Sequence, residues 1–413
     1  MSERLTAFVR RGRGEALVLS GARGVSALCA LGIAMASARQ LGPGPRGEIV
    51  LVVTVAMLAS ELVALGSDTS GRVSILRGGG GGGMVGDLLG LTVALSFVQG
   101  GVVATALIAI NKVSGLLESN LILPGVLLGV TMFQGRMLTG GGFAVRRPGA
   151  VALHDVLVGL APLVAVFCVA VVHRLSTENV VGLIALGYGV GDAYLWGAVL
   201  RHSDGFHLRP RRWKPILTQG IPVLASGLAQ MIVFRFDRLV VGLAVGASEL
   251  GVYSVAATAA EAPRVLLIAT TQILTNRIAT GELIRPSRAT IMRNLVLGYW
   301  LILGLTAVVV PRLLVSVVGQ GFSGAEGQVP VLVIGEALMG TYLIMMSLLT
   351  GTARFRALPG PTIAGAVVFL SGCVQFVPSG GETAAALVRV ASFGLMAVVS
   401  SVLVFRRTHH PEV

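Results

Sequence analysis

The sequence predicts an all-helical, polytopic membrane protein with about twelve transmembrane helices in two lobes. Of its 413 residues, 54% are hydrophobic and 12% are charged, whereas a soluble domain carries about 25% charged residues. The mean hydropathy is +0.84. The apolar runs are also continuous, as membrane helices require, and do not alternate in the manner of membrane strands.

Each predicted span is an apolar run long enough to cross a hydrocarbon core of about 30 Å, which takes roughly 20 helical residues. In order, the runs cover residues 16–38, 47–66, 88–110, 118–137, 153–172, 180–200, 217–240, 251–278, 294–317, 330–350, 361–378 and 383–405. The rest of the chain forms tails and short loops, which leaves no room for a soluble catalytic domain. We therefore expect no catalytic residue, cofactor or metal site.

A basic segment, "RHSDGFHLRPRRWKPIL", divides the spans six and six. Gly42 and Gly47 before the second span have the same spacing as Gly246 and Gly251 before the eighth. This weak repeat predicts two six-helix lobes around a central cavity, related by a pseudo-twofold axis along the membrane normal. The predicted parts are a basic tail (1–15), the N-terminal lobe (16–200), a basic linker (201–216), the C-terminal lobe (217–405) and a C-terminal tail (406–413).

The distribution of lysine and arginine residues predicts the orientation of the chain in the membrane. With the N-terminus inside, most of the 32 basic residues fall on the cytoplasmic side, as the positive-inside rule requires. Both termini are therefore expected in the cytoplasm, and the chain in a bacterial plasma membrane. Anionic lipids are the expected contacts of this charge. Nucleic acid is not expected, because the charge is spread over many short loops.

The glycine run 78–83 raises the question of a phosphate-binding loop. It lacks the following Lys-Ser/Thr and the preceding strand that such a loop needs. Consecutive glycines mainly add conformational freedom to the chain. We interpret the run as a flexible cytoplasmic linker.

The second half contains several distinctive motifs. Residues 216–279 carry a proline early in the seventh span (Pro222), an Asp-Arg pair near its outer end (Asp237, Arg238) and "LGVYS" at the start of the eighth span. Residues 317–357 carry "GQGFSGA" before the tenth span and "GTAR" after it. The first half carries less distinct motifs. Arg46 stands at a position where proteins with these motifs commonly have an aromatic residue.

These motifs resemble the polysaccharide-biosynthesis oligosaccharide flippases of the multidrug/oligosaccharidyl-lipid/polysaccharide exporter superfamily. The resemblance implies a two-lobed transporter of twelve to fourteen helices that works by alternating access. It also implies a lipid-linked glycan substrate, moved from the inner to the outer leaflet for lipopolysaccharide, capsule or exopolysaccharide synthesis. A glycan polymerase and glycosyltransferases are candidate partners. In this family, spans one, two, seven and eight line the cavity.

Ionisable residues inside the spans are the site candidates, because each costs about 2.5 to 3.5 kcal/mol on insertion scales. Guanidinium groups match the oxygens of a pyrophosphate well. The predicted substrate-binding residues are Arg23, Arg235, Arg238 and Arg264. The predicted coupling or charge-pairing residues are Glu61, Asp237 and Glu261. Asp155, Asp192 and Glu336 are expected to make helix-end or interhelical hydrogen bonds.

Helical spacing predicts some of the partners. Glu261 and Arg264 are three positions apart and can pair within one helix. Arg235 and Arg238 share a face, so the partner of Asp237 should come from another span. Arg238 either faces the cavity or extends to the outer surface. Arg23 either contacts substrate or pairs with Glu61.

Three other functions are alternatives to the flippase. A cation-coupled drug antiporter would favour an anionic cavity, whereas the candidate set here is rich in arginine. A membrane glycosyltransferase or polymerase would need a large outer loop. A non-transporting scaffold for cell-wall or polysaccharide assembly remains open, because the first half departs from the family pattern.

Overall fold

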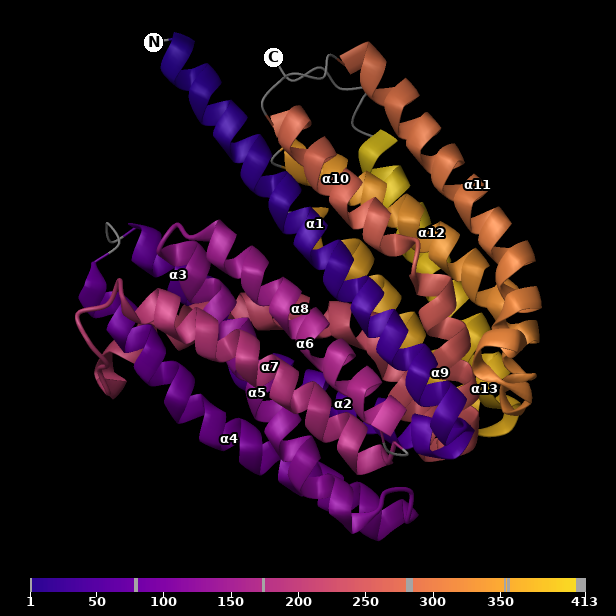
Figure 1. Ribbon diagram of the computed structural model, residues 1–413. Helices are drawn as coiled ribbons and strands as arrows, with labels where there is room; N and C mark the ends of the chain where they lie inside the picture. Colours follow the sequence, from indigo (N-terminus) through magenta and orange to yellow (C-terminus); the bar gives the residue numbers. More distant parts are fainter. Residues whose placement is uncertain are drawn as a thin grey trace. The chain divides into compact units, whose positions relative to one another are not determined.

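The computed structural model describes residues 2–77, 81–172, 175–279, 285–352, 354 and 357–405. This part of the chain is almost entirely α-helical and contains no strand. Its long helices follow one another through short turns (Figure 1). In chain order they are α1 (Ser2–Leu41), α2 (Pro43–Ala64), α3 (Ser67–Arg77), α4 (Gly82–Ser114), α5 (Ile122–Ala144), α6 (Pro148–Val172), α7 (Thr177–Leu200), α8 (Pro210–Ala244), α9 (Ala247–Glu261), α10 (Arg264–Ala279), α11 (Arg285–Val318), α12 (Ala325–Gly351) and α13 (Pro359–Phe405), with short 3-10 turns at Ser119–Leu121 and Gln320–Phe322.

The predicted fold class is confirmed. Within the described residues, nine helices are long and apolar enough to cross a membrane, or ten if the bent α8 counts as one span. The predicted eighth span is α9 and α10, which are separated at Ala262 and Pro263. The last two predicted spans are the two parts of α13, whose backbone is non-helical at Gly381 (φ 61°, ψ −152°). Glycine adopts this left-handed φ without steric strain.

The chain forms two compact units, Met1–Met231 and Ile232–Val413. We call them the N-terminal bundle and the C-terminal bundle. The boundary lies inside α8, so this helix contributes its first part to one bundle and its last part to the other. The domain limits drawn from the sequence stay a prediction.

In the N-terminal bundle, α5 packs against α2, α4 and α7, and α6 packs against α1 and α7. The most hydrophobic 18-residue stretch of α2 is 72% buried, which makes α2 a central helix of this bundle. The turn after α2 meets α8 closely: a Cβ on Gly220 would lie 2.1 Å from the carbonyl oxygen of Leu65. Glycine at this position therefore lets the two backbones meet.

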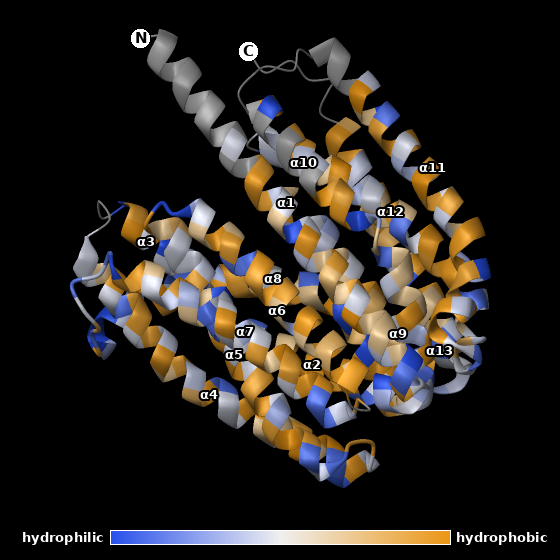
Figure 2. Ribbon diagram, in the orientation of Figure 1, coloured by the Kyte–Doolittle hydropathy of each residue, from blue (hydrophilic) through white to orange (hydrophobic). Residues whose placement is uncertain are grey.

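In the C-terminal bundle, α12 is the central helix, because it packs against α9, α10, α11 and α13. Its apolar stretch is 61% buried, whereas that of α11 is only 17% buried. Hydrophobic residues nevertheless cover most of α11 (Figure 2). A helix that is apolar but little buried in protein suits a surface that faces lipid.

Three features were not expected from the sequence. The helix α3 occupies the segment between the second and third predicted spans, and α1 begins at Ser2, although its apolar part begins at Leu17. The basic linker is fixed against α4: the N–H of His207 donates to the carbonyl oxygen of Gly86 at 3.2 Å, and Arg212 pairs with Asp87 at 3.4 Å. Of the predicted glycine linker, residues 78–80 lie outside the described residues, and α4 begins at Gly82.

Candidate functional site

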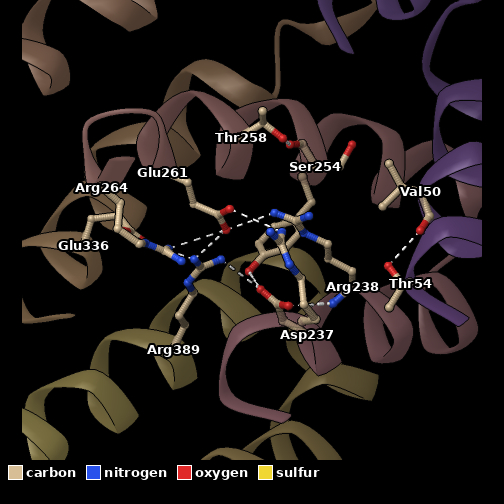
Figure 3. Close-up of polar contacts among 12 residues, drawn as sticks. Val50, Thr54, Asp237, Arg238, Ser254, Thr258, Glu261, Arg264, Glu336 and Arg389 are labelled. Carbon is tan, nitrogen blue, oxygen red and sulfur yellow. Dashed lines mark hydrogen bonds and ion pairs between the residues drawn. The ribbon is translucent and has the colours of Figure 1, made fainter. Parts of the chain in front are cut away.

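Seven ionisable side chains meet inside the C-terminal bundle (Figure 3). We call them the arginine–carboxylate cluster. They come from five helices: Arg235, Asp237 and Arg238 from α8, Glu261 from α9, Arg264 from α10, Glu336 from α12 and Arg389 from α13. The cluster therefore joins every long helix of this bundle except α11.

Arg389 is at the centre of the cluster and is only 1% exposed. Its Nη1 donates to Asp237 Oδ2 at 3.1 Å, and its Nη2 donates to Glu261 Oε1 at 2.7 Å and to Glu336 Oε1 at 2.8 Å. One guanidinium thus bridges three carboxylates from three other helices. Charge-assisted bonds of this kind are stronger than neutral ones.

Arg264 binds Glu336 with two nitrogens. Its Nε donates to Glu336 Oε2 at 2.7 Å, and its Nη2 contacts Oε1 of the same carboxylate. The predicted pair with Glu261 is present at 3.7 Å, so it is the weaker of the two pairings. The guanidinium also lies over the ring of Phe234, 5.3 Å from its centroid. Arg264 is therefore occupied mainly by a partner on α12.

Asp237 has its partners on other helices, as predicted. Besides Arg389 of α13, the hydroxyl of Tyr253 on α9 donates to Asp237 Oδ2 at 2.6 Å. The backbone N–H of Arg238 donates to Oδ1 at 2.9 Å. The carboxylate is completely buried, so its charge is balanced inside the bundle.

Arg235 and Arg238 share one face of α8, as predicted, and both reach Glu261. Arg238 Nη2 donates to Glu261 Oε1 at 2.9 Å, and Arg235 Nη1 donates to Oε2 at 3.3 Å. Their side chains are 11% and 24% exposed. Arg238 therefore turns inward, and the alternative in which it extends to the outer surface is wrong. Arg235 is the more exposed of the two.

The break between α9 and α10 places two of these charges. Pro263 has no backbone N–H and interrupts the helix, so Glu261 ends α9 and Arg264 begins α10. An acid at a helix C-terminus and a base at an N-terminus both oppose the helix dipole. Partners from α8, α12 and α13 compensate for this unfavourable placement.

The cluster carries an excess of positive charge. Four guanidinium groups meet three carboxylates, and the basic members are all arginine. Such an arrangement attracts anions, and planar guanidinium groups can grip phosphate oxygens with two nitrogens at once. The excess is chemically accessible at Arg235, the most exposed member of the cluster.

The N-terminal bundle has a smaller group around Arg136 of α5. Arg136 contacts both carboxylate oxygens of Glu61 on α2, one of them at 3.1 Å, and its Nε lies 3.3 Å from Asp68 Oδ2 on α3. The predicted alternative of a pair between Arg23 and Glu61 is wrong, because Arg136 occupies Glu61. Arg23 lies instead 3.5 Å from Asp155 of α6.

A third group lies where α6 meets α7. His154 contacts Asp155 on its own helix and Asp192 on α7, at 3.2 Å and 3.1 Å. The interhelical hydrogen bonds expected for Asp192 and Glu336 are thus confirmed. Asp155 reaches another helix through Arg23 of α1.

Sequence reasoning missed Arg136, His154 and Arg389. Arg389 lies in the apolar run "AAALVRVASF", so the rule that selected the other intramembrane charges also applies to it. Arg136 closes the fourth predicted span in "FQGRML", at a cytoplasmic end where the positive-inside rule already accounts for a basic residue. His154 gave a weaker signal, because a single neutral histidine at a helix end is common.

Comparisons with known proteins agree with this architecture. Residues 92–274 match the family described as "Polysaccharide biosynthesis protein". No curated protein matches the chain by sequence. Among solved structures, the fold is similar to an inward-facing multidrug resistance MATE family transporter of the MOP superfamily, with a TM-score of 0.74 and 14% identity over 95% of this chain and 98% of that one.

The fold is similar to that of the lipid II flippase MurJ to the same degree. That structure, in an inward closed conformation, gives a TM-score of 0.74 and 11% identity over 94% of this chain and 87% of the other. The resemblance seen in the sequence motifs is therefore confirmed: the chain shares its fold with a MATE transporter of the MOP superfamily and with MurJ, and its residues 92–274 match the polysaccharide biosynthesis proteins.

Proposed function

We propose that the chain is a flippase that moves a polyprenyl-pyrophosphate-linked glycan precursor from the inner to the outer leaflet by alternating access. The match to polysaccharide biosynthesis proteins and the fold shared with a lipid II flippase support this function. The observation that carries it is the excess of guanidinium groups in the C-terminal bundle.

A lipid-linked glycan brings a pyrophosphate, whose negative charge must be stabilised on its way through the membrane. Arg235 and Arg238 share the single carboxylate Glu261. A pyrophosphate can take over these two guanidinium groups while Glu261 keeps its bond to Arg389. The cluster thus offers an anion site and retains a balanced interior.

The candidate arginines differ in how available they are. Arg23 is the most exposed of them at 45%, and its contact with Asp155 is long. Arg264 is 9% exposed and holds Glu336 with two nitrogens. We therefore assign direct contact with phosphate to Arg235 and Arg238 in the C-terminal bundle and, as a separate contact, to Arg23 in the N-terminal bundle. Arg264 holds Glu336 in place for the cluster.

One observation favours a second candidate, the cation-coupled drug antiporter. Carboxylates outnumber arginines in the polar groups of the N-terminal bundle, and a MATE transporter shares the fold. An organic cation would, however, be repelled by the positive excess of the arginine–carboxylate cluster. This candidate therefore ranks second.

The test uses the chain's own host with the gene deleted and then restored on a plasmid. We expect the deletion to abolish the extracellular glycan and to accumulate its lipid-linked precursor. Arg235→Gln and Arg238→Gln should each reduce extracellular glycan at least about tenfold, because a hydrogen bond to a charged group contributes roughly 1.5 to 3 kcal/mol. Membrane levels of the protein, followed by immunoblot, should stay unchanged.

Two controls sharpen this test. Arg312→Gln removes an exposed arginine near the end of α11 and should leave glycan export intact. Arg235→Lys keeps the charge but loses the planar fork, so it should restore export only in part. Normal export in both Arg235→Gln and Arg238→Gln would refute the proposal. Efflux of a cationic dye that depends on Asp237 and Glu261 would favour the antiporter.

A further inference from the structure

We propose that His154, Asp155 and Asp192 form a proton-binding site in the N-terminal bundle, and that its proton is released and taken up once per transport cycle. The first half of this proposal rests on local geometry alone. The second half rests on the proposed function. The bound proton is the coupling ion of the transport cycle. The arginine–carboxylate cluster is already crowded with guanidinium groups and does not need this proton.

The geometry places a buried histidine between two carboxylates. His154 Nδ1 lies 3.2 Å from Asp155 Oδ1, and His154 Nε2 lies 3.1 Å from Asp192 Oδ1. His154 is 4% exposed and Asp192 is 2% exposed. Both ring nitrogens are therefore within hydrogen-bond distance of a carboxylate oxygen.

Counting protons shows what this arrangement demands. A neutral imidazole has one N–H, and an ionised carboxylate can only accept. With a neutral ring, one of the two contacts would bring a nitrogen lone pair against a carboxylate oxygen. Two good hydrogen bonds need one more proton, and the position between two anions places it on the imidazole. His154 is then an imidazolium that donates to Asp155 and to Asp192.

The charge of the group leads to the same conclusion. Arg23 of α1 lies 3.5 Å from Asp155 Oδ2, so two carboxylates face one arginine and the histidine. With the extra proton the four side chains are neutral together. Without it they carry one unbalanced negative charge within a membrane helix bundle, which is costly in a medium of low dielectric constant.

The neighbouring helices contribute the remaining surroundings. The charged neighbours of His154 are Asp192 on α7, Arg23 on α1 and Asp155 on α6 itself. On α5, Gly135 lies against the group: a Cβ at this position would lie 2.8 Å from Asp192 Oδ1 and 3.2 Å from His154 Nε2. A glycine at this point leaves room for the histidine and the aspartate to meet.

A second oxygen of Asp192 points to a bound proton independently. Within the described part of the chain, Asp192 Oδ2 is buried and has no hydrogen-bond partner. A buried carboxylate oxygen without a donor is unfavourable while the group is fully ionised. A proton shared between Asp192 and His154 reduces the charge on this carboxylate and hence the penalty for leaving Oδ2 unbonded.

The path that we propose for the proton leads through the more exposed side of the group. The side chains of Asp155 and Arg23 are 19% and 45% exposed, whereas the side chain of Asp192 is 3% exposed. The proton on His154 Nδ1 therefore passes to Asp155 Oδ1 and then to water. After its release, the Nδ1 lone pair faces the Asp155 carboxylate, and the repulsion drives Asp155 toward Arg23.

This step links proton release to helix packing. Asp155 can bind either His154 on its own helix or Arg23 on α1, and α1 packs along α6. The protonated state holds Asp155 on His154, and the deprotonated state strengthens the contact between α1 and α6. Release of the proton thereby strengthens the contact between α1 and α6, and its uptake weakens this contact. A coupling ion must shift a conformational equilibrium in this way.

Nuclear magnetic resonance of the full-length protein tests the binding of the proton. The protein is labelled with ¹⁵N-histidine and placed in phospholipid nanodiscs, and His154→Gln identifies the signal of His154 among the six histidines. We expect both ring nitrogens of His154 to be protonated at neutral pH, and this signature to be lost in Asp192→Asn. The exposed His202 serves as the internal control. A neutral His154 at neutral pH would overturn the site.

Glycan export in the host tests the use of the proton. His154→Lys places a permanent cation between the two carboxylates, so the protein should keep its melting temperature but lose at least about tenfold of its export, because one charge state is locked. His202→Gln should export normally. Wild-type export by His154→Lys would refute the coupling, whatever the resonance result. Normal export in Arg235→Gln and Arg238→Gln, together with a protonated His154, would instead refute the flippase and leave the proton site standing.

Discussion

The two bundles bury ionisable groups of opposite balance. In the C-terminal bundle, four arginines and three carboxylates form one continuous cluster around Arg389. In the N-terminal bundle, the carboxylates of Glu61, Asp68, Asp155 and Asp192 are divided between two groups that contain only Arg136 and Arg23 as arginines. This opposite balance is the basis of the two proposals, an anion site in one bundle and a proton site in the other.

This difference shows that burial alone does not define the role of a charge. Permanent guanidinium groups, which do not lose their proton, suit a site that must attract phosphate. A histidine between carboxylates can gain or lose a proton with little rearrangement. The following predictions test whether this division holds, in order of expected effect.

Replacing Arg389 by leucine should be the most damaging change. Its side chain is 1% exposed and bridges Asp237, Glu261 and Glu336. Removing one partner of a buried ion pair costs about 3 to 5 kcal/mol, because the other charge stays buried. We expect a clear drop in the melting temperature of the purified protein in detergent, with Arg312→Gln as the control. Equal melting of the two variants would show that the cluster does not stabilise this bundle.

Arg136→Leu is the corresponding substitution in the N-terminal bundle and should also lower the stability of the protein. Arg136 is 27% exposed and contacts Glu61 and Asp68, so we expect a loss near the lower end of the roughly 3 to 5 kcal/mol for buried pairs. Adding Glu61→Gln should recover part of this loss, because the uncompensated carboxylate is removed. A double variant as unstable as the sum of the two single variants would mean that the pair is not coupled.

Tyr253→Phe should have a smaller effect. The hydroxyl donates to the buried carboxylate of Asp237 at 2.6 Å, and a hydrogen bond to a charged group contributes about 1.5 to 3 kcal/mol. The matched control is Tyr342→Phe, because Tyr342 pairs with the neutral Thr362 at 2.8 Å in the same bundle. Thermal melting of both variants compares a charged with a neutral acceptor. A larger loss in Tyr342→Phe would contradict this account of the cluster.

Gly135→Ala is expected to have the smallest effect on stability. The added methyl group would stand 2.8 Å from Asp192 Oδ1, and overpacking of this kind costs about 1 to 3 kcal/mol. The matched control is Gly100→Ala, where the nearest atom, in Val130, lies at an ordinary 3.5 Å. We also expect the ¹⁵N signal of His154 to shift in Gly135→Ala alone. An unchanged signal would show that Gly135 does not lie against His154 and Asp192 as it does in the structure.

Part of the candidate site could be predicted from the sequence. Arg235, Asp237, Arg238, Glu261 and Arg264 were selected because each interrupts an apolar run, where a charge needs a partner or a polar cavity. Helical spacing correctly predicted that Arg235 and Arg238 share one face of their helix. It also correctly predicted that the partner of Asp237 lies on another helix. These inferences depend only on local geometry.

The identity of the partners was beyond the sequence. Arg264 binds Glu336 in preference to Glu261, three positions away, and Glu61 binds Arg136 and not Arg23. Each of these choices depends on which helices pack together. The sequence alone contains no measure of the distance between two helices.

The amino-acid sequence by itself determined the fold class, because continuous apolar runs of helical length have only one stable form in lipid. It also determined which charges require an explanation, because each is costly in an apolar span. The tertiary structure decided how these charges are balanced. Arg389 meets Asp237 across 152 positions of the chain, and only the packing of α8, α9, α12 and α13 brings one guanidinium within reach of three carboxylates.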